Sequence, residues 1–269
     1  MVNNEIRAVF FHMTSLRGNN DWNAIMNVLA NHNVSAIVVE GILPTVTVYP
    51  STVAYSTASL DFITPALQYA HPLGIDVYIA MDVLGPGAST TAFMCTEYNG
   101  ASFNWMNPTN PAVQIYIKAL VEELLTKYPQ IDGFMYDYMR WMWQSTGGAP
   151  PTIDYSTHSK ASLENWLGET ITSFPGDFAP GGTRFNTFLE WRVSVITQLV
   201  ADMNTWMREK QSNLKIAAAP WSLIATETDS EIRKFLGQDW QDWAMKGLLD
   251  WAAPMSYNNA ADLETLFRP

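Results

Sequence analysis

The sequence predicts an α/β fold of the (β/α)8 barrel (TIM-barrel) type, with about six strand–helix units visible. Short apolar runs alternate along the chain with longer segments whose apolar residues recur every three or four positions. The 269 residues, of which 48% are hydrophobic, suit one barrel domain of this kind. Strands that alternate with helices pair in parallel through right-handed crossovers. We therefore expect a single domain over residues 1–269.

The first half of the chain contains three predicted strands, and a polar residue stands at or just beyond the end of each. The strands are expected at 8–13, 36–40 and 76–81, with helices between them at 21–30 and 60–70. The polar residues are His12, Glu40 and Asp82. Asn20 or Asp21 would cap the first helix, because a side-chain oxygen there can accept from the free N–H groups of the first turn.

The fourth strand carries charge in an apolar setting. A strongly periodic helix over 111–127 leads to a short apolar run over 133–138, with Asp137 and Arg140 near its end. A carboxylate buried without a partner costs several kcal/mol. Asp137 must therefore lie either in a hydrogen-bonded network or in a wet cleft where its charge is used.

A long insertion, 141–185, separates this strand from the next helix. It is rich in Gly, Pro, Ser and Thr, with a small helix expected around 162–167, and loops of this length are usually functional or mobile. Beyond it the pattern predicts a helix at 185–210, a strand at 215–219, a helix at 232–246, a strand at 250–257 and a further helix from 261 to 267.

Six units fall two short of a closed barrel. An open barrel leaves unpaired strand edges, which are a liability unless they are covered. We expect that the native chain is longer and carries further strands or domains, or that the barrel is open or completed by another molecule, such as a second copy in a homo-oligomer.

The predicted strand ends gather seven polar or aromatic residues on one rim. In parallel sheets flanked by helices, ligands bind at the carboxyl ends of the strands. The residues expected there are His12, Glu40, Asp82, Asp137, Arg140, Trp221 and Tyr257. This convergence predicts the binding site.

Composition and motifs argue against several other classes of protein. The formal charge of −11 leaves no basic stripe for nucleic acid, and no segment is long and apolar enough to span a membrane. The four histidines are scattered, so no metal site is expected, and Cys95 is the only cysteine. We find no phosphate-binding glycine loop, no Gly-x-Ser-x-Gly elbow and no strand-borne lysine, and we expect no cofactor.

Several stretches in series resemble the glycosyl hydrolase-like 10 family of bacterial and archaeal surface proteins. They are Met106–Val113, Ile131–Arg140, Phe188–Thr197, Ala219–Trp221, Gln238–Trp243 and Asp250–Tyr257. The resemblance implies a carbohydrate-active TIM barrel with Asp137 in the active cleft. It also implies an extracellular or cell-surface location, although no secretory leader precedes Glu5.

The chain departs from the family pattern at two places. The family usually continues past the strand at 250–257 into further strands. Its Tyr-Pro after the arginine is replaced here by Trp141-Met142, which changes the expected shape of the loop.

Glycoside hydrolysis usually needs two carboxyl groups that flank the scissile bond. We expect Asp137 to act as nucleophile or as stabiliser of the positive charge, kept ionised by Arg140. Glu40 ranks first as the acid/base, and Asp82 or Asp239 could take that role or bind sugar hydroxyls. An ion pair between Asp137 and Arg140 that only holds the loop, and a salt bridge that occupies Glu40, remain the structural alternatives.

The expected function is a glycoside hydrolase that cleaves a polysaccharide or glycan by this two-carboxylate mechanism. Substrate contacts are expected from His12, Tyr136, Arg140, Trp141, Trp221, Asp239 and Tyr257. The alternative is a non-catalytic carbohydrate-binding or surface assembly protein that kept the barrel and lost the acid. For Trp221 and Tyr257, lining the barrel mouth without touching ligand is the competing role, and for His12 it is a structural hydrogen bond.

Overall fold

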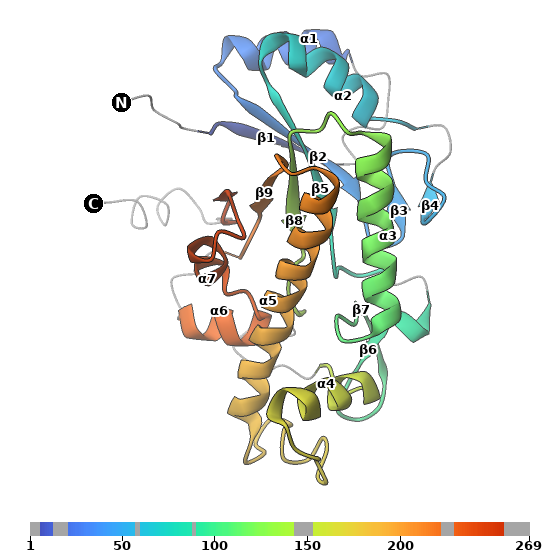
Figure 1. The fold of residues 1–269 in the computed structure, drawn as a ribbon, viewed down its shortest axis with the longest axis vertical. Coiled ribbons are helices and arrows are strands. Elements are labelled where there is room, and N and C mark those ends of the chain that lie inside the picture. Colours follow the sequence, from blue (N-terminus) through green and yellow to red (C-terminus); the bar gives the residue numbers. More distant parts are fainter. Residues whose placement is uncertain are drawn as a thin grey trace, which may run out of the picture.

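Six parallel strands, paired in the order in which they occur in the chain, form the central sheet (Figure 1). The computed structural model describes residues 6–12, 21–56, 60–87, 90–142, 153–221 and 229–255. The strands are β1 (Ala8–Phe11), β2 (Ala36–Ile42), β5 (Asp76–Asp82), β8 (Gly133–Asp137), β9 (Lys215–Ala218) and β10 (Trp251–Ala252). The predicted incomplete (β/α)8 barrel is confirmed.

Helices cover the outer face of this curled sheet (Figure 1). They are α1 (Trp22–Asn31), α2 (Ile63–Ala70), α3 (Pro111–Lys127) and α5 (Phe185–Lys210). The outward side chains of the strands, such as Ile37, Ile79 and Phe134, share one core with the apolar faces of these helices. A second, smaller cluster lies on the inner face, where Val38, Met135 and their neighbours pack together. Each strand thus alternates between two apolar environments, as a barrel strand must.

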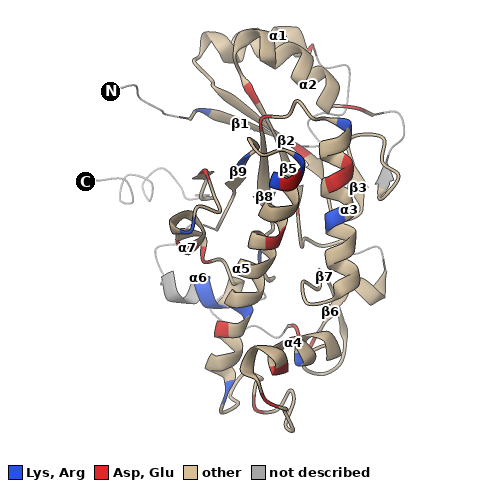
Figure 2. Cartoon of the chain, viewed as in Figure 1, with Lys and Arg blue, Asp and Glu red and all other residues tan. Residues whose placement is uncertain are grey.

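The helix starts follow from local chemistry. Asp21 caps α1, since its side chain accepts from the N–H of Ala24 at 3.0 Å. Asn110 caps α3 in the same way through Ala112, and Pro111 takes the first helical position, where a missing N–H costs nothing. Acidic and basic residues are interspersed along α3 and α5 (Figure 2).

A lobe beyond the carboxyl ends of the strands was only partly predicted. It contains the hairpin of β6 (Met94–Thr96) and β7 (Ser102–Met106), the helix α4 (Thr157–Leu167) and the first half of α5 (Figure 1). Asp154 ties the hairpin to α4, because its carboxylate accepts from Thr96 N at 2.5 Å and from Ser159 Oγ at 2.5 Å. The small helix expected around 162–167 is α4, which begins at Thr157.

The predicted helix over 232–246 is wrong as one element. The chain forms α6 (Asp229–Leu236) and α7 (Trp240–Met245), separated at Gly237. Gly237 has φ +72°, a left-handed conformation that ends a helix readily only at glycine. Gln238 follows this break and forms hydrogen bonds to the loops after β8 and β9.

Two short strands remain at the end of β2. β3 (Val46–Thr47) pairs antiparallel with β2, and β4 (Tyr55–Ser56) pairs with β3. Two 3-10 turns, η2 (His71–Leu73) and η3 (Thr91–Phe93), complete the elements. None of the helices within the described ranges is long and apolar enough to cross a membrane.

Candidate active site

The inner face of the sheet carries the acidic residues predicted at the strand ends. Asp82 and Asp137 are direct partners across β5 and β8, and Glu40 is paired with Ala80 on the other side of β5. Side chains two residues apart on a strand share a face, so Asp82 points to the same side as Ala80. His12 extends this face beyond β1. The structure therefore gathers His12, Glu40, Asp82 and Asp137 on one side of the sheet at its carboxyl end.

A cavity of about 270 Å³ lies against this face. His12 and Asp137 line its polar part, while Phe10, Trp251 and Met255 are among its apolar lining. Trp251 also packs edge to face against Tyr78, with ring centroids 5.3 Å apart. A carboxylate beside aromatic and aliphatic walls is typical of a site that binds a partly apolar ring.

Asp82 is the most strongly perturbed of these acids. It is 5% exposed, and its Oδ1 has no hydrogen-bond partner among the described residues. Burial, and then the neighbouring charges of Asp137 and Glu40, raise the pKa of Asp82 to about 8, against the opposing effect of Arg140. A carboxyl group with this pKa carries a proton at neutral pH.

Asp137 is held in a more polar environment. Burial raises its pKa above the ordinary value. The N–H of Tyr138, which donates to Asp137 Oδ1 at 2.7 Å, and the charge of Arg140 reduce this rise without cancelling it. Tyr138 has φ +48°, which is uncommon for a residue other than glycine. Strained backbone of this kind is often found at functional sites.

Glu40 and His12 form a pair at the edge of the site. His12 Nδ1 lies 3.3 Å from Glu40 Oε1, and the imidazole packs against Phe10 with ring centroids 4.8 Å apart. This contact is the pairing with a base from a neighbouring strand that was the alternative role for Glu40, and it is an ion pair when the imidazole is protonated.

Arg140 lies among three aromatic rings. Its guanidinium carbon is 4.7 Å from the ring centroid of Tyr138, 5.2 Å from that of Trp221 and 5.5 Å from that of Trp105. Gln238 closes the arrangement, since it accepts from Trp221 N at 3.0 Å and donates to the carbonyl of Met139 at 3.3 Å. The predicted Trp221 thus lies beside Arg140.

The structure does not bring two of the predicted substrate contacts to the rim, because both side chains are buried in the core. Tyr136 is one residue out of phase with Asp137, so it faces the helices, where its hydroxyl accepts from Asn204 Nδ2 at 3.0 Å. Trp141 is fully buried, and its indole N–H donates to the carbonyl of Arg192 at 3.0 Å.

Of the two remaining predicted contacts, Asp239 and Tyr257, the structure describes only Asp239. Asp239 precedes α7 and accepts from Arg233 Nε at 2.5 Å, and Arg233 also binds Glu190 of α5. Asp239 therefore belongs to an ion-pair cluster between helices. Tyr257 lies outside the described residues.

Sequence reasoning missed Trp105, Gln238 and Trp251. Trp251 could have been found by counting alternate positions along its strand, but Trp105 and Gln238 reach the site from an unpredicted hairpin and an unpredicted helix break. In the described part of the chain, no three His, Cys, Asp or Glu side chains come together as metal ligands would.

The family model described as Glycosyl hydrolase-like 10 matches residues 91–266. No curated protein matches the chain. The glycoside hydrolase domain of PgaB (BpsB) from Bordetella bronchiseptica superposes with a TM-score of 0.72 at 16% identity, over 93% of this chain and 74% of that one.

Two β-galactosidases share the fold as well. The enzyme from Rahnella sp. R3 superposes with a TM-score of 0.66 at 12% identity, over 95% of this chain and 40% of its own. The enzyme from Bacillus circulans gives 0.61 at 11% identity, over 97% and 42%. The chain thus spans about two fifths of the length of each β-galactosidase, and identities this low show a common barrel fold.

Proposed function

Since the chain belongs to the glycosyl hydrolase-like 10 family, we propose that it hydrolyses O-glycosidic bonds in a polysaccharide or glycan. The reacting groups in this proposal are Asp137 and Asp82. Asp137 stabilises or attacks the positively charged anomeric carbon, and Asp82 donates the proton to the leaving oxygen. The observation that carries the proposal is the pairing of these two aspartates on the inner face, where Asp137 lines a cavity at the barrel rim.

The spacing of the two strands favours a two-carboxylate mechanism. Neighbouring strands lie about 4.8 Å apart, and paired residues project to the same side. Two carboxyl groups on such positions approach the separation of about 5–5.5 Å that is typical of retaining glycosidases. The site therefore favours attack by one carboxylate while the other transfers protons.

The raised pKa of Asp82 is the reason to assign it, rather than Glu40, as the general acid. A general acid must hold its proton near the working pH, and burial beside Asp137 and Glu40 raises the pKa of Asp82 to about 8. The proton moves from Asp82 to the glycosidic oxygen as the C–O bond breaks. Water then supplies the hydroxyl of the new reducing end, and its proton returns to Asp82. Glu40, paired with His12, is left to bind sugar hydroxyls.

The walls of the cavity suit a sugar ring. Carbohydrate rings present apolar C–H faces, and aromatic side chains offer matching surfaces. Phe10 and Trp251 supply such surfaces next to Asp137. The sugar's hydroxyl groups would then meet His12 and the carboxyl groups.

The test is a panel of polysaccharides and oligosaccharides incubated with the intact protein, with release of reducing ends as the readout. We expect at least one substrate to be cleaved by wild type and by Asp76→Asn, which alters an acid at the opposite end of β5. Asp137→Asn and Asp82→Asn should still bind that substrate, measured by calorimetry, but cleave it at least about 100-fold more slowly. Cleavage unaffected by Asp137→Asn would overturn the assignment, while binding without cleavage by wild type would favour the non-catalytic alternative.

A further inference from the structure

Trp105 contacts Arg140 in two ways, although it lies 35 positions earlier in the chain. Its indole N–H donates to the carbonyl oxygen of Arg140 at 3.1 Å, and its ring lies 5.5 Å from the guanidinium carbon. Trp105 is 1% exposed, so the indole itself is held in place by the surrounding core. One side chain thus fixes both the backbone and the charged end of Arg140.

Two further rings restrict the same guanidinium. Tyr138 and Trp221 come from the segments after β8 and β9, while Trp105 comes from β7. A cation enclosed by aromatic faces is attracted to each ring, most strongly where water is excluded. Arg140 is 5% exposed, so its charge occupies a defined place rather than a range of surface positions.

The position of this charge matters because acids crowd the inner face. Arg140 and Glu40 of β2 both act electrostatically on the pKa of Asp82 and of Asp137. His12, at the end of β1, also acts on the pKa of Asp137. An opposite charge at about 4–6 Å favours the ionised form of a carboxyl group, and the effect declines with distance. Movement of the guanidinium would therefore change the proton affinity of both aspartates.

We propose that Trp105 is a positioning residue, which sets the balance of protonation between Asp82 and Asp137 by fixing Arg140. The role rests on the proposed function only for its catalytic consequence. The hairpin β6–β7 then has a purpose at the site, because it delivers Trp105 from the lobe to the rim. No contact of Trp105 with substrate is required.

The test measures carboxyl titration directly and needs no substrate. Aspartate labelled with 13C at the side-chain carboxyl is introduced, and the midpoints of Asp82 and Asp137, assigned with the Asn variants, are followed by NMR. In Trp105→Leu, which removes both the N–H and the ring, we expect the Asp82 midpoint to rise by about half a pH unit or more. Trp105→Phe keeps a ring and should give a smaller rise. Trp243→Leu and Trp243→Phe are matched controls, since Trp243 is also fully buried and its indole N–H donates to Thr197 Oγ1 at 2.9 Å.

A double substitution separates positioning from general damage to the fold. Arg140→Gln should raise the midpoints by about one unit or more. With Arg140→Gln already present, Trp105→Phe should produce no further change. Midpoints in folded Trp105 variants that match those of the Trp243 controls would overturn the proposal, as would an equal shift with and without Arg140. Neither outcome depends on whether the protein cleaves a glycan, so failure of the positioning role and failure of the hydrolase function can be told apart.

Discussion

Asp82 is the residue at which stability and function are opposed. Its carboxyl group is buried beside two other acids, and one of its oxygens has no hydrogen-bond partner among the described side chains and backbone groups. An uncompensated acid in this position is costly when ionised. Such a cost is typical of residues whose pKa is adjusted for proton transfer.

We predict that Asp82→Asn stabilises the protein in a pH-dependent way. The pKa of Asp82 is about 8 in the folded state, against about 3.9 for an unfolded aspartate. Between these values the unfolded chain releases a proton that the folded chain keeps, so wild-type stability falls as pH rises from about 4 to about 8. Asparagine does not titrate. The variant should therefore match wild type near pH 4 and exceed it by roughly 2–4 kcal/mol at pH 7, as measured by denaturant unfolding.

Asp154→Asn is the contrasting control for this prediction. The Asp154 carboxylate is also buried, but it accepts hydrogen bonds from Thr96, Ser156 and Ser159. Its replacement removes an acceptor from a satisfied network and should destabilise the protein at pH 7. A gain in Asp82→Asn that stays constant from pH 4 to pH 8 would contradict the raised pKa.

At the residue scale, the sequence predicts well which acids lie at the ends of the strands. It predicts less well which face of the sheet the residues next to them occupy. His12, Glu40, Asp82 and Asp137 were predicted together because strand ends converge on one rim. Tyr136 was predicted to contact substrate, but it lies one residue from Asp137, and a shift of one residue along a strand moves a side chain to the other face. Trp141 was also predicted to contact substrate, but it is buried. The burial of a residue beyond the end of a strand depends on packing against distant helices, which no local sequence pattern encodes.

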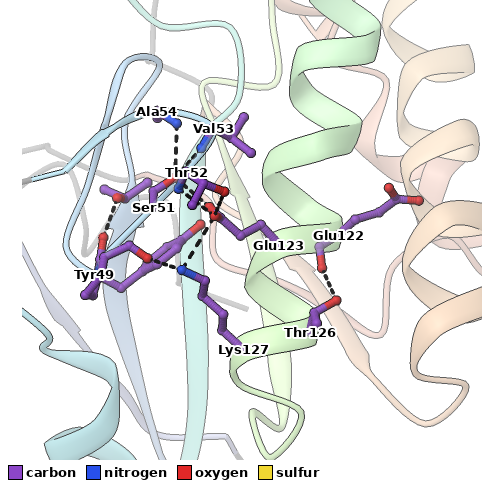
Figure 3. Close-up of polar contacts among 11 residues, drawn as sticks. Tyr49, Ser51, Thr52, Val53, Ala54, Glu122, Glu123, Thr126 and Lys127 are labelled. Carbon is purple, nitrogen blue, oxygen red and sulfur yellow. Dashed lines mark hydrogen bonds and ion pairs between the residues drawn. The ribbon is translucent and has the colours of Figure 1, made fainter.

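At the scale of elements, short polar clamps fasten loops to helices. Figure 3 shows Glu123 of α3 binding the loop that follows β3: its carboxylate accepts from Ser51 Oγ at 2.5 Å, and from Thr52 N and Thr52 Oγ1 at 2.7 Å each. Lys127, one turn further along α3, lies 3.6 Å from the same carboxylate and also binds the carbonyl of Pro50. Burial alone would raise the pKa of Glu123, but these hydrogen bonds outweigh it and the pKa lies below its ordinary value.

We predict that Glu123→Gln weakens this clamp. Glutamine keeps one acceptor oxygen and loses the charge, so we expect a loss of about 1–2 kcal/mol in unfolding free energy. Hydrogen exchange at the amide of Thr52 should become faster. Glu122→Gln is the matched control, since the Glu122 side chain forms an exposed pair with Lys118 at 3.8 Å and its replacement should change stability by less than about 0.5 kcal/mol. Equal effects of the two substitutions would show that the clamp contributes nothing of its own.

The elements that the sequence predicts are those with long, regular periodicity. The helices α3 and α5 have the predicted bounds, because each buries one continuous face. The hairpin β6–β7 was missed since its strands are short and its position depends on Asp154, almost 60 residues further along the chain. The break between α6 and α7 was missed because the apolar spacing continues through Gly237.

At the scale of the whole molecule, one buried cation joins the barrel to the lobe. Arg192 of α5 is fully buried and donates to the carbonyls of Ile153 in the lobe and Phe235 at the end of α6. Its guanidinium carbon lies 4.6 Å from the ring of Trp141. Burial lowers the pKa of Arg192 to about 10, so the group remains charged at neutral pH.

We predict that Arg192→Met destabilises the protein by roughly 2–5 kcal/mol. Methionine fills much of the volume, but it leaves two buried carbonyl groups without their donors, at about 1–3 kcal/mol each. Denaturant unfolding at pH 7 measures the loss. Lys160→Met, which removes an exposed partner of Glu164 in the same lobe, should cost less than about 0.5 kcal/mol. A loss no larger than that of this control would contradict the joining role of Arg192.

The fold as a whole was predictable because alternating strands and helices permit few arrangements. Parallel pairing in chain order follows from right-handed crossovers, and the six parallel strands expected from the sequence are those of the described structure. The lobe was only partly predictable: its helices follow from periodicity, but long-range hydrogen bonds and a buried arginine hold it against the barrel.

The central claim is that Asp82 and Asp137 act together on a glycosidic bond, and the pH dependence of kcat/KM tests it most directly. On a substrate identified in the glycan panel, we expect a bell-shaped profile whose alkaline side falls near pH 8, as Asp82 loses its proton. Asp82→Asn should remove that alkaline limb along with most of the activity, and Asp137→Asn should lower kcat/KM at every pH. A wild-type profile that stays flat through pH 8, or one that both variants leave unchanged, would contradict the account.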